Sequence, residues 1–146
     1  MKPRTRARSI ALQALYEIDQ TGHSPGEILQ ERIAESPLED ILVSFAQHIL
    51  FGILPLIRQL DALIAQYAPE WPLDQVAIID RNILRIAIWE IAFDQQTPLK
   101  VAINEAVELA KLFGSDSTPR FVNGVLGSLA LHQNEIIQNL QRKSSQ

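Results

Sequence analysis

The stretch Asp80–Asp94, with the sequence DRNILRIAIWEIAFD, constrains the fold more than any other part of the chain. When its residues are placed at intervals of 100°, apolar side chains cover both sides of the resulting helix, and Arg81 and Arg85 form the main polar seam. Most helices without a wide polar face are buried, so other helices must pack against this one from both sides. We therefore expect Asp80–Asp94 to form the central helix of a helical core.

Glu90 lies within the apolar part of that stretch, between Ile83 and Ile86 on the helix surface. Burying a carboxylate is unfavourable unless a partner compensates its charge. Glu90 is therefore expected to pair with a cation, to cap a neighbouring helix or to reach a surface where a partner sits. The preferred interpretation is a structural glutamate whose charge is satisfied.

The rest of the chain also has helical periodicity, and no segment shows the alternation of apolar and polar residues that is typical of a strand. Several prolines stand where a helix would begin, a position at which helices tolerate proline. The expected helices cover residues 5–20, 25–35, a kinked or double segment from 37 to about 64, a short turn at 73–76, and residues 80–94, 98–113 and 120–140. The chain is thus expected to be all-α, a compact helical bundle of about six to seven helices.

At 146 residues the chain has the length of a single domain, 1–146. Its clearest internal boundary is Ala68–Pro72, where two prolines exclude a regular helix. This boundary divides the domain into an expected subdomain 1–68 and an expected subdomain 73–141. The polar residues 142–146 are expected to form a disordered tail.

Few chemical functions fit this composition. The chain has no cysteine, which excludes disulfides, thiolate zinc sites and cysteine nucleophiles. Its three histidines have no metal-ligand spacing, and its glycines form neither a GxGxxG nor a Walker pattern. Glu105 and Glu108 could be imagined as an acid pair, but exposed acids beside an apolar helix face explain them better. We expect no catalytic residue, no metal site and no cofactor, and therefore no enzyme.

The N-terminal segment places basic residues before apolar ones, as a signal peptide does. Gln13, Glu17 and Asp19 interrupt its apolar positions, however, so this segment is predicted to be neither a signal peptide nor a membrane span. The absence of cysteine agrees with a reducing compartment. The expectation is a soluble, cytoplasmic protein with no membrane contact.

Positive charge is concentrated at the N-terminus. The net charge of the whole chain is −4, yet Lys2, Arg4, Arg6 and Arg8 place four cations within the first eight residues. These cations lie at the N-terminal end of the first expected helix, where the helix dipole disfavours positive charge, so they are poorly explained as helix stabilisers. An external anion explains them better, with a solvated tail that aids solubility as the alternative.

A second candidate lies at the start of the last expected helix. Arg120 and Phe121 occupy its first turn, next to a loop of serine, aspartate and threonine residues that offers backbone N–H groups. Such an arrangement can bind an anion and stack a nucleobase. Packing of Phe121 into the core is equally compatible with the sequence.

Four segments together resemble the NusB family of transcription antitermination factors. They lie between Arg4 and about Leu131 and read RTRARSIALQALY (4–16), DRNILRIA with Glu90 (80–90), KVAINEAVELAK (100–111) and RFVNGVL (120–126). Four such segments in this order and spacing make the resemblance highly specific. It implies an all-helical fold of two three-helix-like subdomains.

The resemblance also implies a function and a set of residues. Family members are bacterial proteins that bind boxA-like single-stranded RNA together with NusE, which is also a small-subunit ribosomal protein. Their complex joins the antitermination machinery with RNA polymerase on ribosomal RNA operons. Carried over by position, the RNA-binding residues are Arg4, Arg6, Arg8, Ser117, Arg120 and Phe121, to which the cluster of N-terminal cations adds Lys2. Asp80 matches a family position on the NusE-binding side.

This chain departs from the family pattern at two places. Thr5 and Ala7 interrupt the run of cations, which favours a lower RNA affinity, and Asp116 precedes Ser117, which leaves open which of the two meets RNA. Two other functions also remain open on the sequence. One is the RNA-binding domain of an rRNA methyltransferase, because the N-terminal part of such enzymes resembles the same fold. The other is a purely protein-binding helical module, which the acidic body of the chain favours.

Overall fold

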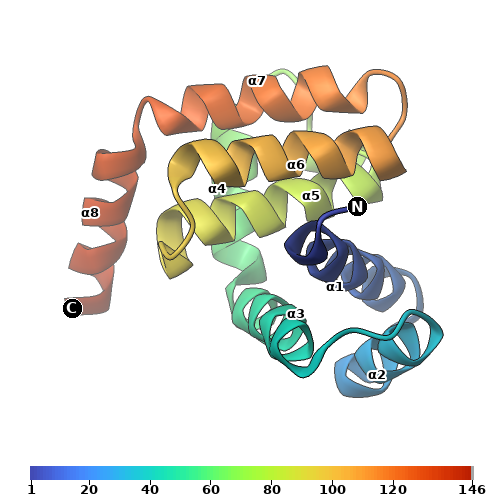
Figure 1. The fold of residues 1–146 in the computed structure, drawn as a ribbon. Coiled ribbons are helices and arrows are strands. Elements are labelled where there is room, and N and C mark those ends of the chain that lie inside the picture. The colour runs from blue at the N-terminus through green and yellow to red at the C-terminus, as the bar shows by residue number, and fades with distance from the viewer. Residues whose placement is uncertain (146) are drawn as a thin grey trace.

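The computed structural model describes residues 1–145, and Gln146 lies outside the described residues. The described part is helical and contains no strand (Figure 1). Its α-helices are α1 (Pro3–Thr21), α2 (Pro25–Glu35), α3 (Asp40–Ile53), α4 (Ile57–Tyr67), α5 (Ile78–Ile88), α6 (Leu99–Phe113), α7 (Thr118–Ala130) and α8 (Gln133–Ser145). Short 3₁₀ turns cover Leu54–Leu56 and Leu73–Gln75, and a π-helical turn covers Trp89–Asp94. The prediction of an all-α bundle is confirmed.

The predicted central helix is also confirmed. α5 contacts α1, α4, α6 and α7, and every side chain from Asn82 to Ile88 is buried. Leucine and isoleucine side chains from these helices form one hydrophobic core. Because full burial of one such side chain contributes roughly 1.5–3 kcal/mol, α5 supplies a large share of the free energy that holds the bundle together.

The central helix continues past α5 in a wider form. The π-helical turn Trp89–Asp94 ends at Gln95, which adopts the left-handed conformation with φ of 58°. Trp89 is buried against α3, where a methyl group at Gly52 would overlap its indole ring. Gly52 therefore allows α3 to approach the end of the central helix closely.

Helix packing crosses the boundary at Ala68–Pro72. α1 packs against α2, α3 and α5, and α3 packs mainly against α1, whereas α4 packs against α5 and α7. The change of packing partner falls at the 3₁₀ turn Leu54–Leu56, which contains Pro55. The kinked or double segment predicted from residue 37 to about residue 64 is confirmed, and it takes the form of two abutting helices.

The last predicted helix, 120–140, is two helices in the structure. α7 ends at Ala130, Leu131 is 85 % exposed in the turn, and α8 runs steeply away from α7 (Figure 1). The bend places Ile136 in the core and α8 against the π-helical turn. α8 extends to Ser145, so residues 142–145 of the expected tail are helical, and the last residue of that tail lies outside the described residues.

The segment Asp40–Tyr67, which spans α3 and α4, is long and apolar enough to cross a membrane by length and composition, with a mean hydropathy of 1.8. In this fold a 3₁₀ turn interrupts the segment, and Ile49, Leu50 and Leu60 lie in the hydrophobic core. Core helices of soluble proteins meet the same criterion of length and hydropathy. The two helices are integral parts of the bundle.

Candidate nucleic-acid interface

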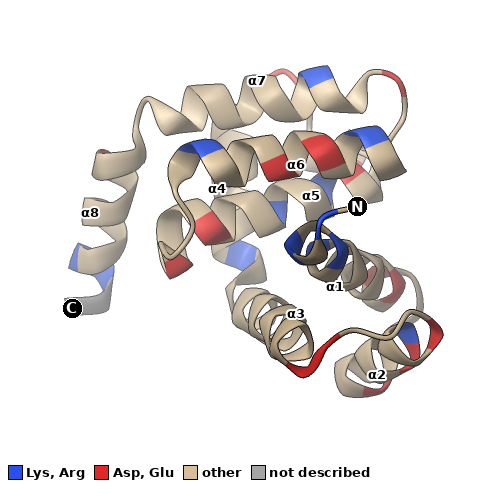
Figure 2. Ribbon diagram, in the orientation of Figure 1, with Lys and Arg blue, Asp and Glu red and all other residues tan. Residues whose placement is uncertain are grey.

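The four N-terminal cations lie at the start of α1, where Figure 2 shows basic residues gathered. Lys2 and Arg4 are exposed. The guanidinium of Arg4 lies 4.9 Å from the ring centroid of Phe45 on α3, which is a cation–π distance. This contact holds Arg4 at the surface without neutralising its charge. Lys2 and Arg4 are therefore accessible to an anion.

Arg6 joins α1 to the loop between α2 and α3. Its Nη2 donates hydrogen bonds to Ser36 Oγ at 2.8 Å and to the carbonyl oxygen of Pro37 at 2.9 Å. Ser36 therefore accepts a hydrogen bond from another helix and does not cap the next one. As a consequence, α3 begins at Asp40, later than the predicted start after Ser36.

Arg8 is buried, with 2 % of its surface exposed. Its Nη2 lies 2.8 Å from Glu90 Oε1, and its Nε donates to Glu90 Oε2 at 3.1 Å. Glu90 is 1 % exposed and also accepts a hydrogen bond of 3.0 Å from the hydroxyl of Thr97. Of the three roles expected for Glu90, the structure shows pairing with a cation, and that cation is Arg8.

A surface hollow of about 420 Å³ opens beside the exposed cations. It is lined by the start of α1 and the connection into α6, through Lys2, Pro3, Arg4, Arg8, Gln96, Thr97, Pro98, Val101 and Glu105. The carboxylate of Glu105 accepts a 2.7 Å hydrogen bond from Thr5 and lies 3.6 Å from Arg8, so its charge is compensated. The exposed Gln96 adds an amide that can donate and accept. The hollow can therefore hold a phosphate group or part of a nucleotide.

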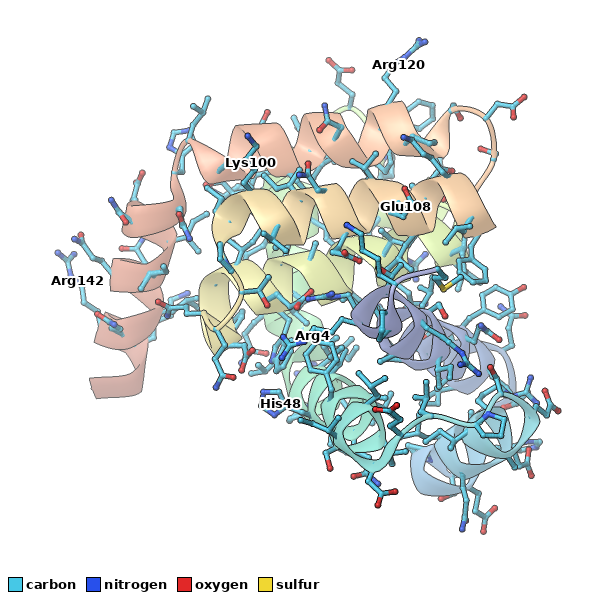
Figure 3. The ribbon with its side chains drawn as sticks, in the orientation of Figure 1. Arg4, His48, Lys100, Glu108, Arg120 and Arg142 are labelled. Atoms are coloured by element: carbon cyan, nitrogen blue, oxygen red, sulfur yellow. The ribbon has the colours of Figure 1, made fainter. Side chains whose placement is uncertain are left out.

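The second predicted patch lies at the start of α7. Ser117 and Arg120 are exposed, and the side chain of Arg120 extends away from the bundle (Figure 3). Phe121 is partly buried and packs against the hydrophobic core. The buried part of the ring therefore stabilises the fold, and the exposed part is accessible to a ligand. Asp116 and Ser117 are both exposed, so a ligand can reach either.

The two basic patches are separate in the structure. α6 lies between the start of α1 and α7 and contacts both helices (Figures 1 and 3). Asn104 and Glu108 are exposed on α6. A ligand that touches both patches must therefore cross α6, which an extended single-stranded nucleic acid can do and a small ion cannot.

Asp80 lies in the first turn of α5, next to the start of α7. Its Oδ1 accepts a hydrogen bond of 2.9 Å from Thr118 Oγ1. Partial burial raises the pKa of Asp80 above its ordinary value of 3.8, and the hydrogen bond from Thr118 opposes this shift. The carboxylate is thus held between the protein interior and the surface.

A hollow of about 800 Å³ begins directly before Asp80. It is lined by Gln13, Tyr16, Glu17, Gln20, Arg32, Ala77, Ile78, Ile79 and Phe113. Its walls are largely apolar, and Glu17 and Arg32, 3.7 Å apart, form an ion pair at its lining. A largely apolar surface with a few charged groups is suited to a protein segment.

Sequence reasoning did not identify Phe45, Gln96, Thr97 and Glu105 as neighbours of the N-terminal cations. The hydrogen bond from Thr5 to Glu105 joins residues 100 positions apart, so no local pattern reveals it. The one available signal was that Glu90 required a cation.

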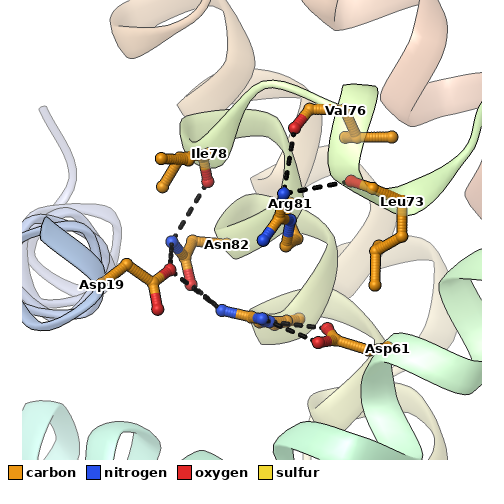
Figure 4. A network of polar contacts seen from close by, with 8 residues as sticks. Asp19, Asp61, Leu73, Val76, Ile78, Arg81 and Asn82 are labelled. Atoms are coloured by element: carbon orange, nitrogen blue, oxygen red, sulfur yellow. Dashed lines mark hydrogen bonds and ion pairs between the residues drawn. The ribbon is translucent and has the colours of Figure 1, made fainter.

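Arg85 is also buried, and it bonds to Asp19, Asp61 and Asn82 in a network of polar contacts. Figure 4 shows Asp19, Asp61, Arg81 and Asn82 of this network. Its Nε and Nη2 each lie 2.8 Å from a carboxylate oxygen of Asp61, and its Nη1 lies 3.1 Å from Asp19. Arg81 donates to the carbonyl oxygen of Leu73. The polar seam predicted for the central helix thus joins α1, α4 and the segment before α5.

Comparison with known proteins gives consistent matches. The model of the NusB family matches residues 5–131. A transcription antitermination protein NusB of Roseiflexus sp. (strain RS-1) is 46 % identical over 134 residues, which cover 90 % of this chain and 94 % of that protein. The protein of the same name from Bacillus subtilis (strain 168) is 40 % identical over 129 residues, covering 88 % and 95 % of the two chains.

Solved structures share the fold. The structure of T. maritima NusB has a TM-score of 0.78 and 30 % identity, covering 94 % of this chain and 92 % of that one. A crystal structure of the antitermination factors NusB and NusE in complex with dsRNA also has a TM-score of 0.78, with 25 % identity over 95 % of this chain and 98 % of that one.

Proposed function

Since the chain belongs to the NusB family, we propose that it recognises boxA-like single-stranded RNA together with NusE, a small-subunit ribosomal protein, during ribosomal RNA transcription. The family consists of non-enzymatic transcription antitermination factors. The proposed partners are boxA-like RNA, NusE and the antitermination complex with RNA polymerase. The proposed location is the cytoplasm.

The accessible cations at the start of α1, beside the hollow that Lys2 and Arg4 line, support the proposal that the chain binds RNA. Lys2 and Arg4 concentrate positive charge there on a chain whose net charge is −4. Contacts to phosphate dominate the affinity of most nucleic-acid complexes, and exposed cations make them at little cost. Ser117, Arg120 and Phe121 form the second part of the proposed site, in which the exposed part of the aromatic ring can stack on a base.

Arg6 and Arg8 have a different part in the proposed site. Arg6 is held by the loop at Ser36, and Arg8 is enclosed by two carboxylates. We propose that both residues support RNA binding by fixing the start of α1, and that Lys2 and Arg4 make the phosphate contacts.

The hollow before Asp80 supports a partner site on a different face. Tyr16 is an exposed aromatic residue at this hollow, and aromatic residues are enriched in protein interfaces. We propose that NusE binds there, with Asp80 at its border. The NusB of the solved complex was crystallised with NusE and RNA together, which supports two surfaces that work at the same time.

The two other functions are less well supported. The curated relatives match over about nine-tenths of this chain and are described as antitermination proteins, which favours that function over a methyltransferase domain. A purely protein-binding module leaves the exposed cations Lys2 and Arg4 without a role.

Binding of labelled RNA, measured by fluorescence anisotropy with and without NusE, tests the proposal. We expect the chain to bind a boxA-like RNA more tightly than a scrambled RNA of equal length, and NusE to increase that affinity. Tyr16→Ala is the matched control, because it alters the hollow and neither basic patch. It should abolish the increase caused by NusE while the free chain keeps its RNA affinity. Equal binding of both RNAs, unchanged by NusE, would contradict the proposal.

A further inference from the structure

The hydroxyl group of Thr118 is fully engaged by the fold. It donates a hydrogen bond to Asp80 Oδ1 and accepts one from the backbone N–H of Ser115, both at 2.9 Å. Thr118 is 1 % exposed, and Gly114 packs so closely that a methyl group there would overlap the Thr118 side chain. Thr118 therefore ties the turn between α6 and α7 to the first turn of α5.

One end of this connection borders the proposed partner surface. Asp80 directly follows Ala77–Ile79, and Gly114 directly follows Phe113, and these two neighbouring segments line the 800 Å³ hollow. A protein segment seated in the hollow would therefore restrain the backbone immediately before Asp80 and immediately before Gly114.

The other end borders the proposed RNA surface. Ser117 precedes Thr118, and Arg120 follows it after one residue, and both of these neighbours are exposed. The backbone N–H of Phe121 bonds to the carbonyl oxygen of Ser117, so the first turn of α7 moves as one unit with that loop. The hydrogen bonds that fix Thr118 therefore also fix the positions of Ser117 and Arg120.

We propose that Thr118 is a positioning residue that couples the two surfaces. Through its hydrogen bond to Asp80, it holds Ser117 and Arg120 in the arrangement that RNA needs, and a partner in the hollow strengthens RNA binding through the same bond. The inference rests on the proposed function and deepens it, because it names the link through which one ligand affects the other.

The two surfaces are coupled because ligand binding orders the turn between α6 and α7. The residues 115–117 between α6 and α7 are exposed, and their side-chain hydrogen bonds join Ser115 to Thr118 and Ser115 to Ser117. Binding that must order a flexible segment is weakened by the entropy of ordering. A partner that restrains Asp80 reduces the entropy that is lost when RNA binding orders the turn. By thermodynamic linkage, RNA then strengthens partner binding by the same factor.

Two matched pairs of variants isolate the hydrogen bond. Thr118→Val keeps the shape of the side chain and removes the hydroxyl group, whereas Thr118→Ser keeps the hydroxyl group. Asp80→Ala removes the acceptor, whereas Asp80→Asn keeps an oxygen that can accept from Thr118. Each full-length variant is titrated with boxA-like RNA in the absence and presence of saturating NusE, after urea unfolding has shown that it is folded.

We expect Thr118→Val to weaken RNA binding by the free chain roughly fivefold to tenfold, which corresponds to about 1–1.4 kcal/mol, the net contribution of one hydrogen bond. The increase in RNA affinity caused by NusE should shrink at least threefold. Thr118→Ser should keep RNA affinity near that of the unaltered chain, and Asp80→Asn should weaken RNA binding by the free chain less than Asp80→Ala does. Thr118→Val combined with Asp80→Ala should be no weaker than either single variant, because both remove the same bond.

Hydrogen exchange at the Ser115 amide provides a readout that needs no RNA, and exchange should be faster in Thr118→Val than in Thr118→Ser. If Thr118→Val keeps both the RNA affinity and the increase caused by NusE, the coupling role is wrong while the proposed function stands. Equal losses in Thr118→Val and Thr118→Ser would also overturn it. Failure of the unaltered chain to bind RNA would instead overturn the proposed function, and this inference with it.

Discussion

Replacing Arg8 with alanine is expected to lower the free energy of unfolding by about 3–5 kcal/mol. The reason is that Glu90, 1 % exposed, would lose the guanidinium that compensates its charge and keep only the hydroxyl of Thr97. A buried carboxylate without a cation is one of the most destabilising features that a single substitution can create. Urea unfolding followed by circular dichroism measures the change directly.

Two variants control this experiment. Lys2→Ala removes an exposed cation from the same helix start and should leave the unfolding midpoint nearly unchanged. Arg8→Met combined with Glu90→Met replaces the pair by apolar side chains of similar length and should recover much of the loss, since both charges then disappear. An Arg8→Ala variant with the midpoint of the unaltered chain would show that the pair does not stabilise the fold.

Replacing Phe121 with alanine is expected to weaken the binding of boxA-like RNA about tenfold, as the loss of one stacked base would do. Because the ring is partly buried against the core, the free energy of unfolding should also fall, by about 1–2 kcal/mol rather than the roughly 3–5 kcal/mol of a fully buried phenylalanine. Both quantities are measured on one preparation, RNA affinity by anisotropy and stability in urea.

Phe121→Leu separates the two contributions. Leucine keeps most of the apolar packing and has no aromatic ring, so its stability should lie near that of the unaltered chain while its RNA affinity falls as in Phe121→Ala. If Phe121→Leu binds RNA as the unaltered chain does, the ring is only a core residue and Arg120 and Ser117 act without it.

Much of the fold could be predicted because the signals are local. The start of α2 at Pro25, the end of α6 before Gly114 and the burial of α5 all follow from the positions of proline and glycine and from helical periodicity. The break between α7 and α8 could not be predicted in this way. Residues 120–140 keep one helical pattern, and only the burial of Ile136 against distant elements explains the bend.

The candidate site was predictable in position and less so in detail. Charge clustering marked the start of α1, but it could not distinguish a cation that faces solvent from one that faces the core. Arg4 and Arg8 stand four residues apart on one helix, yet Arg4 is exposed and Arg8 is enclosed. What separates them is Glu90, 82 positions away from Arg8, and sequence spacing carries no information about that contact.

The salt dependence of RNA binding shows whether the accessible cations at the start of α1 contact RNA phosphates. Each phosphate contact to a single strand contributes about 0.7 to the slope of the logarithm of affinity against the logarithm of salt concentration. The double variant Lys2→Ala/Arg4→Ala should therefore reduce the slope by about 1.4 and weaken binding at every salt concentration.

The matched control is Arg58→Ala/Arg142→Ala, which removes the same charge from two exposed positions on α4 and α8, away from both patches. This control should keep nearly the slope of the unaltered chain. If Lys2→Ala/Arg4→Ala keeps the slope of the unaltered chain, or loses no more than the control does, then the N-terminal cations do not contact RNA and the account is wrong.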